Sequence, residues 1–184
     1  SIDLSSTAVV SIGNYAFAYC NSLVSASMPT TLAGIGQGAF RQSGLMSIDL
    51  SSTQLTTIPV FAFQRCTLLT SITFPPGLTS IADGVYATSS AFGYSGLMSA
   101  NLSATEVVSI GAYAFVQCSF LESASLPTTL TAIGQAAFLN TGLISIDLSS
   151  TQLETIPVNA LRNCPSLASV LLPTTLTAIG SGAF

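Results

Sequence analysis

The chain has 184 residues, 49% of them apolar, and a formal net charge of −4. Charged residues make up only 5% of the sequence, against about 25% in ordinary soluble domains, and three scattered arginines cannot neutralise a run of phosphates, which argues against nucleic-acid binding. No apolar run approaches the roughly 18–20 residues of a spanning helix, so no transmembrane segment is expected within these residues.

The motif L-x-S-I-x-L recurs along the chain and predicts one β-strand in each of eight stacked coils. In residues 47–51 it places Ile48 and Leu50 on one face, with Ser47, Asp49 and Ser51 on the other. This alternation is typical of a half-buried strand. The copies start mostly 22 or 24 residues apart, at residues 2–4, 23–28, 45–50, 69–74, 97–102, 121–126, 143–148 and 167–172.

Each strand is followed by a turn, a second short apolar segment with residues such as Leu55 and Ile58, a glycine or proline corner, and an Ala-Phe return arc. The arc is too short for a stable helix and is expected to form turns or a 3₁₀ segment. Two types of coil alternate. One ends its arc in AFxxCxxL, as at residues 16–23, and the other ends one residue sooner with Gly before Leu, as at residues 39–45.

One irregularity interrupts this order. Residues 81–92 correspond to residues 35–40 with six extra residues, placed at Val85 to Ser90. An insertion that leaves the flanking repeats intact is typical of a surface loop. Tyr86 in the insertion and the nearby Tyr94 are therefore candidate contact residues.

Residues 45–55 resemble the leucine-rich-repeat signature, and residues 11–23 and 126–138 resemble the LPxxLxxIGxxAFxxCxxL units of the BspA-like subclass. The resemblance implies a leucine-rich-repeat solenoid, a β-rich α/β horseshoe with one parallel sheet on its concave face. It covers residues 1–184 as a single uncapped segment, which we expect to be an excerpt of a longer array. BspA-like proteins are bacterial and protist surface proteins, so the resemblance also implies an extracellular or cell-surface location and binding to host or matrix proteins.

The four cysteines occupy the same phase of alternate coils. Neighbouring cysteines should lie two strand spacings apart, about 9–10 Å, whereas a disulfide needs Cα atoms within about 7 Å. The sequence contains no CxxC spacing of the kind that often binds zinc. We therefore predict reduced, buried core residues at Cys20, Cys66, Cys118 and Cys164.

A column of threonines, broken only by Gly77, lies three positions after the last apolar residue of seven of the eight strands. This is where leucine-rich repeats place Asn or Cys to hydrogen-bond the turn, so we predict a hydroxyl ladder bonded to the backbone. An ice-binding rank is the alternative, and the neighbouring Thr30, Thr128 and Thr174 are expected to point outward. The column is formed by Thr7, Thr31, Thr53, Thr105, Thr129, Thr151 and Thr175.

The outward face of the predicted sheet is the candidate binding face. Its acidic positions recur only every second coil, which suits neither a paired acid–base site nor a calcium cage. Asn101-Leu-Ser103 is an N-glycosylation sequon, and a glycan there would partly block the face. The residues proposed for the face are Ser47, Asp49, Asn101, Ser145 and Asp147.

Catalysis within these residues is improbable. The sequence has no His for a Ser–His or Cys–His pair and no Lys for a Schiff base or a P-loop. We expect no cofactor and no metal. The predicted function is a noncatalytic extracellular or cell-surface module, structural or adhesive, within a larger assembly.

Its expected partners are proteins, extracellular matrix or glycan surfaces, together with end-to-end self-association. Near-identical coils favour a structural role, since dedicated recognition usually shows position-specific aromatic or charged patches. One alternative is binding of ice or crystalline polysaccharide by ranks of Ser and Thr. A second alternative is a ligand-recognition scaffold attached to another domain.

Overall fold

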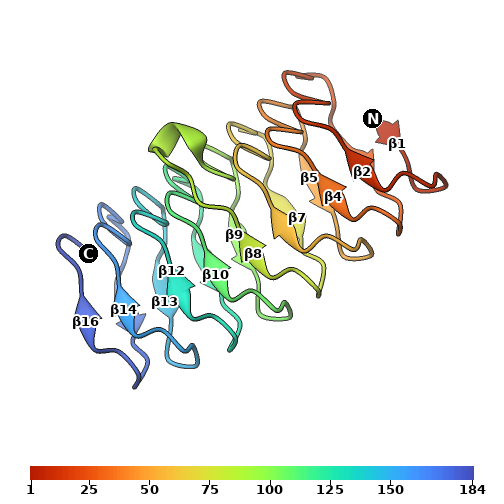
Figure 1. Cartoon of the computed structure of the whole chain (residues 1–184). Coiled ribbons are helices and arrows are strands. Elements are labelled where there is room, and N and C mark those ends of the chain that lie inside the picture. The colour runs from red at the N-terminus through yellow and green to blue at the C-terminus, as the bar shows by residue number, and fades with distance from the viewer.

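The computed structural model describes residues 1–184 as a stack of coils that follow one another along a single axis (Figure 1). Each coil contributes a first strand, a turn, a second strand and a return arc. The first strands, called row one, are β1 (Ile2–Asp3), β3 (Ala26–Ser27), β5 (Ser47–Asp49), β7 (Ser71–Thr73), β9 (Ser99–Asn101), β11 (Ser123–Ser125), β13 (Ser145–Asp147) and β15 (Ser169–Leu171).

Row-one strands pair in parallel and in register two at a time: β1 with β3, β5 with β7, β9 with β11, and β13 with β15. Equivalent residues of the two coils in each pair therefore lie side by side. Ile48 of β5 lies opposite Ile72 of β7, and Ile146 of β13 lies opposite Val170 of β15. The middle residue of each three-residue strand faces inward and the two flanking residues face outward. The repeat phase and the leucine-rich-repeat solenoid predicted from the sequence are confirmed.

A second row of strands differs from the prediction of a single sheet. The second short apolar segment of each coil forms a strand of its own, and these strands make a second parallel row, which lies in front of row one in Figure 1. Each member has only two residues, too few to show the alternation that identifies a strand in a sequence. Row two consists of β2 (Ser11–Ile12), β4 (Gly34–Ile35), β6 (Thr57–Ile58), β8 (Ser80–Ile81), β10 (Ser109–Ile110), β12 (Ala132–Ile133), β14 (Thr155–Ile156) and β16 (Ala178–Ile179).

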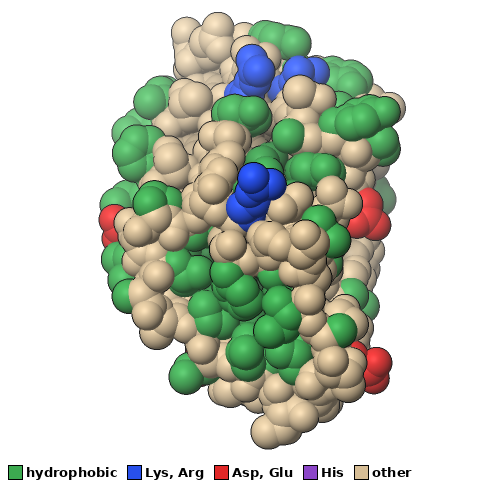
Figure 2. All heavy atoms as spheres, turned by 90° about the vertical axis from the view of Figure 1, so that its left-hand side faces the viewer, with side chains coloured by type: hydrophobic (Ala, Val, Ile, Leu, Met, Phe, Trp, Pro, Cys, Tyr) green, Lys and Arg blue, Asp and Glu red, His purple; other side chains and the backbone are tan.

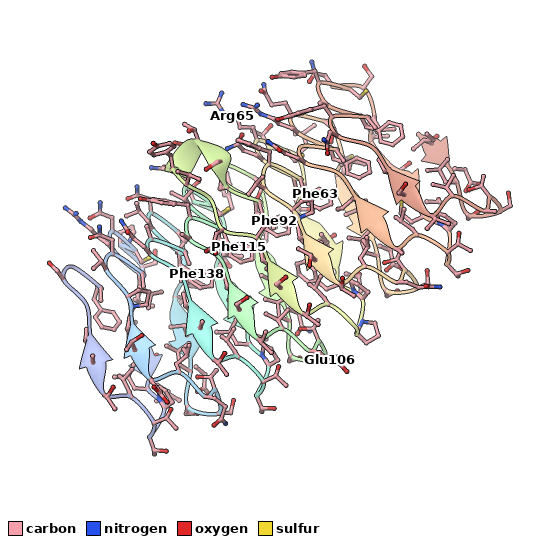
Figure 3. The ribbon with its side chains drawn as sticks, in the orientation of Figure 1. Phe63, Arg65, Phe92, Glu106, Phe115 and Phe138 are labelled. Atoms are coloured by element: carbon pink, nitrogen blue, oxygen red, sulfur yellow. The ribbon has the colours of Figure 1, made fainter.

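The core between the rows contains a continuous stack of phenylalanine rings, one from each of the first six return arcs. Neighbouring ring centroids are 5.0 to 5.5 Å apart, and the ring planes are within 17° of parallel. Figure 3 shows four of the rings in line along the axis. This Phe ladder consists of Phe17, Phe40, Phe63, Phe92, Phe115 and Phe138.

The return arcs are held by the neighbouring coil rather than by helical hydrogen bonds. In the first arc, the N–H groups of Tyr15 and Tyr19 donate to the carbonyls of Gln37 and Arg41 at 2.9 and 2.8 Å. Both tyrosines have positive φ, 56° and 60°, a conformation that costs a non-glycine residue roughly 1–2 kcal/mol. The arcs are turns, as expected, and the 3₁₀ alternative occurs only in the insertion.

The insertion leaves the stack undisturbed. It forms the 3₁₀ helix η1 (Ala87–Ser89), which projects beyond the neighbouring arcs (Figure 1). The side-chain amide of Gln64 donates to the carbonyl of Thr88 at 2.8 Å, so the insertion packs on the preceding arc. Phe92 directly after it takes its place in the Phe ladder. This short helix is far below the length and hydropathy that crossing a bilayer requires.

Glycines at the shorter corners are required by close approach of the preceding coil. A Cβ atom at Gly96 would lie 2.3 Å from the carbonyl oxygen of Thr67, whereas a Cβ at Gly77 would meet nothing within 4 Å.

We predict that Gly96→Ala lowers the free energy of unfolding by about 2 kcal/mol or more, while the control Gly77→Ala changes it by less than about 0.5 kcal/mol. Urea unfolding followed by circular dichroism measures both, and equal losses would contradict the packing described.

Candidate functional site

The predicted binding face is the outward surface of row one. Its first column is a rank of serines, one from each coil and all exposed: Ser1, Ser25, Ser47, Ser71, Ser99, Ser123, Ser145 and Ser169. In the second column, two residues further along each coil, Asp49, Asn101 and Asp147 are also exposed. The structure therefore places all five predicted residues on one face, with Ser47 and Asp49 in one strand and Ser145 and Asp147 in another.

The acidic and amide side chains of this face are engaged in the turn that follows each strand. Asp49 Oδ1 accepts the N–H of Ser51 at 2.9 Å, and Asp147 Oδ1 accepts the N–H of Ser149 at 2.9 Å. Asn101 Oδ1 accepts the N–H of Ser103 at 3.1 Å. These side chains close Asx-type turns, which is a structural role that the sequence analysis did not assign to them.

The alternation of the acidic column has a physical cause in the turn. Two residues after each Asp or Asn stands a serine, whose N–H needs an acceptor. In the intervening coils the same position is proline, which has no N–H to satisfy. Those coils carry Ser27, Thr73, Ser125 and Leu171 in the second column, and their prolines are Pro29, Pro75, Pro127 and Pro173.

Hydrogen bonding to the turn also keeps these carboxylates ionised. The N–H of Ser51 is the main cause that lowers the pKa of Asp49, and the hydroxyls of Ser5 and Ser149 lower the pKa values of Asp3 and Asp147. No group of three His, Cys, Asp or Glu side chains gathers anywhere in the chain to hold a metal ion. The face therefore presents isolated carboxylates between hydroxyl groups.

The threonine column is directed at the backbone, which confirms the hydroxyl ladder. In one coil type the hydroxyl bonds its own turn, as Thr53 does by donating to the carbonyl of Leu50 at 2.7 Å. In the other type it bonds the preceding coil, as Thr129 does by donating to the carbonyl of Val107 at 2.8 Å. An ice-binding rank built on this column is therefore disfavoured, whereas Thr30, Thr128 and Thr174 are exposed as expected.

All four cysteines are free, but they are not equally buried. Cys66 and Cys118 lie in the core, and Cys118 Sγ donates to the carbonyl of Phe92 at 3.2 Å. Cys164 is half-buried and Cys20 is exposed, so the prediction of burial was wrong for Cys20. The preceding arc covers each later cysteine, and residues 1–184 contain no return arc before Cys20.

The return arcs gather the positive charges and the tyrosines on a different face. The guanidinium of Arg65 lies 5.5 Å from the ring centre of Tyr94, and that of Arg41 lies 5.1 Å from Phe61. Figure 2 shows two basic side chains at the top and the third below them near the middle of the face, with the acidic side chains at the sides. Figure 3 shows Arg65 and Glu106 at opposite edges. Sequence reasoning missed this grouping.

The sequence does contain a signal for this grouping, because every arginine follows the Ala-Phe or Ala-Leu of a return arc: Arg41, Arg65 and Arg162. Of the two predicted loop contacts, Tyr86 lies on the insertion and is 69% exposed. Tyr94 lies on the arc beside Arg65 and is half-buried.

Comparison with known proteins matches residues 1–91 and 86–184 to the BspA type leucine rich repeat region, present in 6 copies. A leucine-rich repeat protein from Bacteroides ovatus shares 22% identity over 96% of this chain and 55% of its own, with a TM-score of 0.67. The leucine rich repeat protein of T. pallidum shares 25% identity over 94% of this chain and 67% of its own, with a TM-score of 0.60.

A leucine rich cell surface protein from Faecalibacterium prausnitzii shares 21% identity over 96% of this chain and 55% of its own, with a TM-score of 0.50. The chain thus spans about half of the first of these solved relatives. A search of curated proteins found no match.

Burial raises the pKa of the Cys118 thiol to about 11, whereas a cysteine thiol in an unfolded chain has a pKa of about 8.5. Its contribution to stability is complete below the lower value and is lost as pH rises toward the higher one, with a slope of about 1.4 kcal/mol per pH unit. We predict that Cys118→Ser removes this alkaline loss. Urea unfolding of both proteins at neutral pH and near pH 10 measures it, and identical pH dependence of the two would contradict the prediction.

Proposed function

Because the chain belongs to the BspA-type leucine-rich repeat family, we propose that it is a noncatalytic cell-surface module, structural or adhesive, within a larger assembly. The observation that carries the proposal is the use made of its polar side chains. Aspartates close turns, buried threonines bond the backbone, and core thiols bond the arcs. The aspartates and the threonines of one coil type hold the turns of their own coils, whereas the threonines of the other type and the core thiols bond the preceding coil. Polar groups committed to the backbone in this way suit a rod more than a reaction centre.

The coil stack supports both parts of this role. Parallel pairing in register recurs along the stack, and the Phe ladder runs through six successive coils, so the rod presents long faces of uniform chemistry. Proteins, extracellular matrix and glycan surfaces are the proposed partners, and coils of this kind are suited to end-to-end stacking with further coils. One solved relative of the same fold is a cell surface protein, which agrees with a surface location.

A second candidate function is binding of ice or a crystalline polysaccharide. The exposed serine rank of row one favours it, because it repeats a hydroxyl at one strand spacing along the whole stack. A thermal-hysteresis assay on the purified chain separates this candidate from the first, for which no hysteresis is expected. A ligand-recognition scaffold joined to another domain is a further alternative, which only activity in the full-length protein would support.

Surface exposure is tested on cells that make the full-length protein. The insertion offers a suitable epitope, since Val85 and Tyr86 are 73% and 69% exposed. Antibodies against residues 85–90 are expected to label intact cells, and mild protease treatment of those cells should remove the label. An antibody against a cytosolic protein is the control. Labelling that appears only after the cells are permeabilised would contradict the proposal.

A further inference from the structure

The surface has four hollows, and three of them lie along one edge of the stack, where the return arcs lead into row one. The fourth lies at the end of the stack, beside Leu161 and Phe184, and does not belong to the series described next. The first and second hollows share Thr67 and Tyr94 in their linings, and the second and third share Gln117 and Ser119. Their volumes are about 490, 290 and 380 Å³. Because neighbouring hollows share lining residues, they form a row parallel to the axis.

The two alternating corner types produce this row. A cysteine corner is one residue longer than a glycine corner, and it forms a ridge, as at Thr67 and Ser119. At a glycine corner the chain approaches the preceding coil so closely that a Cβ would meet a carbonyl oxygen at 2.0 to 2.4 Å. A notch therefore lies over each of Gly44, Gly96 and Gly142. The notches recur every two coils, about 9–10 Å apart at ordinary strand spacing.

The notches are lined by amide, hydroxyl and aromatic side chains, the kinds of group that proteins use to bind sugars. Amide side chains recur along one wall, with Gln42 in the first notch, Gln117 in the second and third, and Asn140 in the third. Tyr94 and Phe120 contribute aromatic rings to the second notch, and Phe120 is 64% exposed. Arg65 is the one charged residue of the three linings, none of which contains a carboxylate.

We infer that this notched edge binds an extended β-linked polysaccharide, with one disaccharide at each notch. Successive sugars of such a chain are turned over, so the same substituent returns to the same side every second sugar, at close to two coil spacings. Sugar ring faces pack on exposed aromatic rings, and amides and hydroxyls bond the sugar hydroxyls. The inference names the class of ligand that the proposed surface module binds. Its biological role rests on the proposed function, since only a protein at the cell surface would meet such a polysaccharide.

An extended peptide fits the row less well. Its equivalent side chains recur every two residues, about 6.6–6.8 Å, which does not match the notch spacing. A polyproline II helix repeats every three residues, about 9 Å, but its known grooves are lined by aromatic side chains. The third notch contains no hydrophobic residue, so a polysaccharide is the better match.

Calorimetry with the purified chain tests the ligand class directly. Cellohexaose and chitohexaose are expected to bind more tightly than the corresponding disaccharides, because a hexasaccharide reaches three notches. The comparison between these two shows whether the notches take bare or N-acetylated sugars. The α-linked maltohexaose, whose chain coils, is expected not to bind.

Two variants locate the site. Phe120→Ala is expected to weaken hexasaccharide binding roughly tenfold. Tyr94→Asn should do the same and keeps a residue type that tolerates the φ of 61° at this position. Tyr86→Ala is the control for Phe120→Ala, since Tyr86 is 69% exposed, close to the 64% of Phe120, but lines none of the notches. Circular dichroism checks that all three variants keep the wild-type fold.

Several results would overturn the inference: no binding of either β-linked hexasaccharide, equal binding of maltohexaose, unchanged binding by both notch variants, or binding of a proline-rich peptide in place of the sugars. These outcomes are independent of cell labelling. A surface-labelled protein that binds no glycan contradicts this inference alone, and a glycan-binding protein that stays inside the cell contradicts the proposed surface role alone.

Discussion

The structure depends on contact between consecutive coils. No coil contains a helix beyond the one in the insertion, and its strands have two or three residues, too few to persist alone. The stabilising bonds run to the next coil, through the parallel pairing of both rows, the arc N–H groups and the Phe ladder. Stability in such a chain is a sum of neighbour interactions, so each side chain is constrained by the same position one coil away.

This constraint explains the unusual composition. Identical residues stack at about 4.8 Å, where a column of like charges would repel and a column of Ser, Thr or Phe would not. The carboxylates of row one are accordingly separated by Ser27, Thr73 and Ser125, and in each of those coils a proline removes the N–H that a carboxylate would bind. Low charge and alternating coil types are thus two consequences of stacking, and the alternation in turn creates the notched edge.

Periodicity in the sequence was enough to predict the eight coils and the inward isoleucines, because the pattern is repeated in every coil. It was not enough for the second row, whose strands have two residues, or for the arcs, where Tyr15, Arg65 and Gln117 adopt a positive φ that their side chains do not suggest. Asp49 and Asp147 were predicted to lie on the exposed face, and they do. Their bonds to the turn were visible only as an alternation with proline two residues later. The notches depend on how two corner lengths meet across coils, which no single repeat reveals.

The central claim is that adjacent coils, and not distant ones, stabilise each other. Double-mutant cycles on the Phe ladder test it most directly, using Phe→Leu substitutions that keep most of the buried volume. Phe92 and Phe115 are in contact at 5.0 Å, whereas Phe63 and Phe138 are separated by both of them. The account predicts a coupling energy of about 1 kcal/mol for the adjacent pair and additivity within about 0.5 kcal/mol for the distant pair. Equal coupling in the two cycles, or none in either, would contradict it.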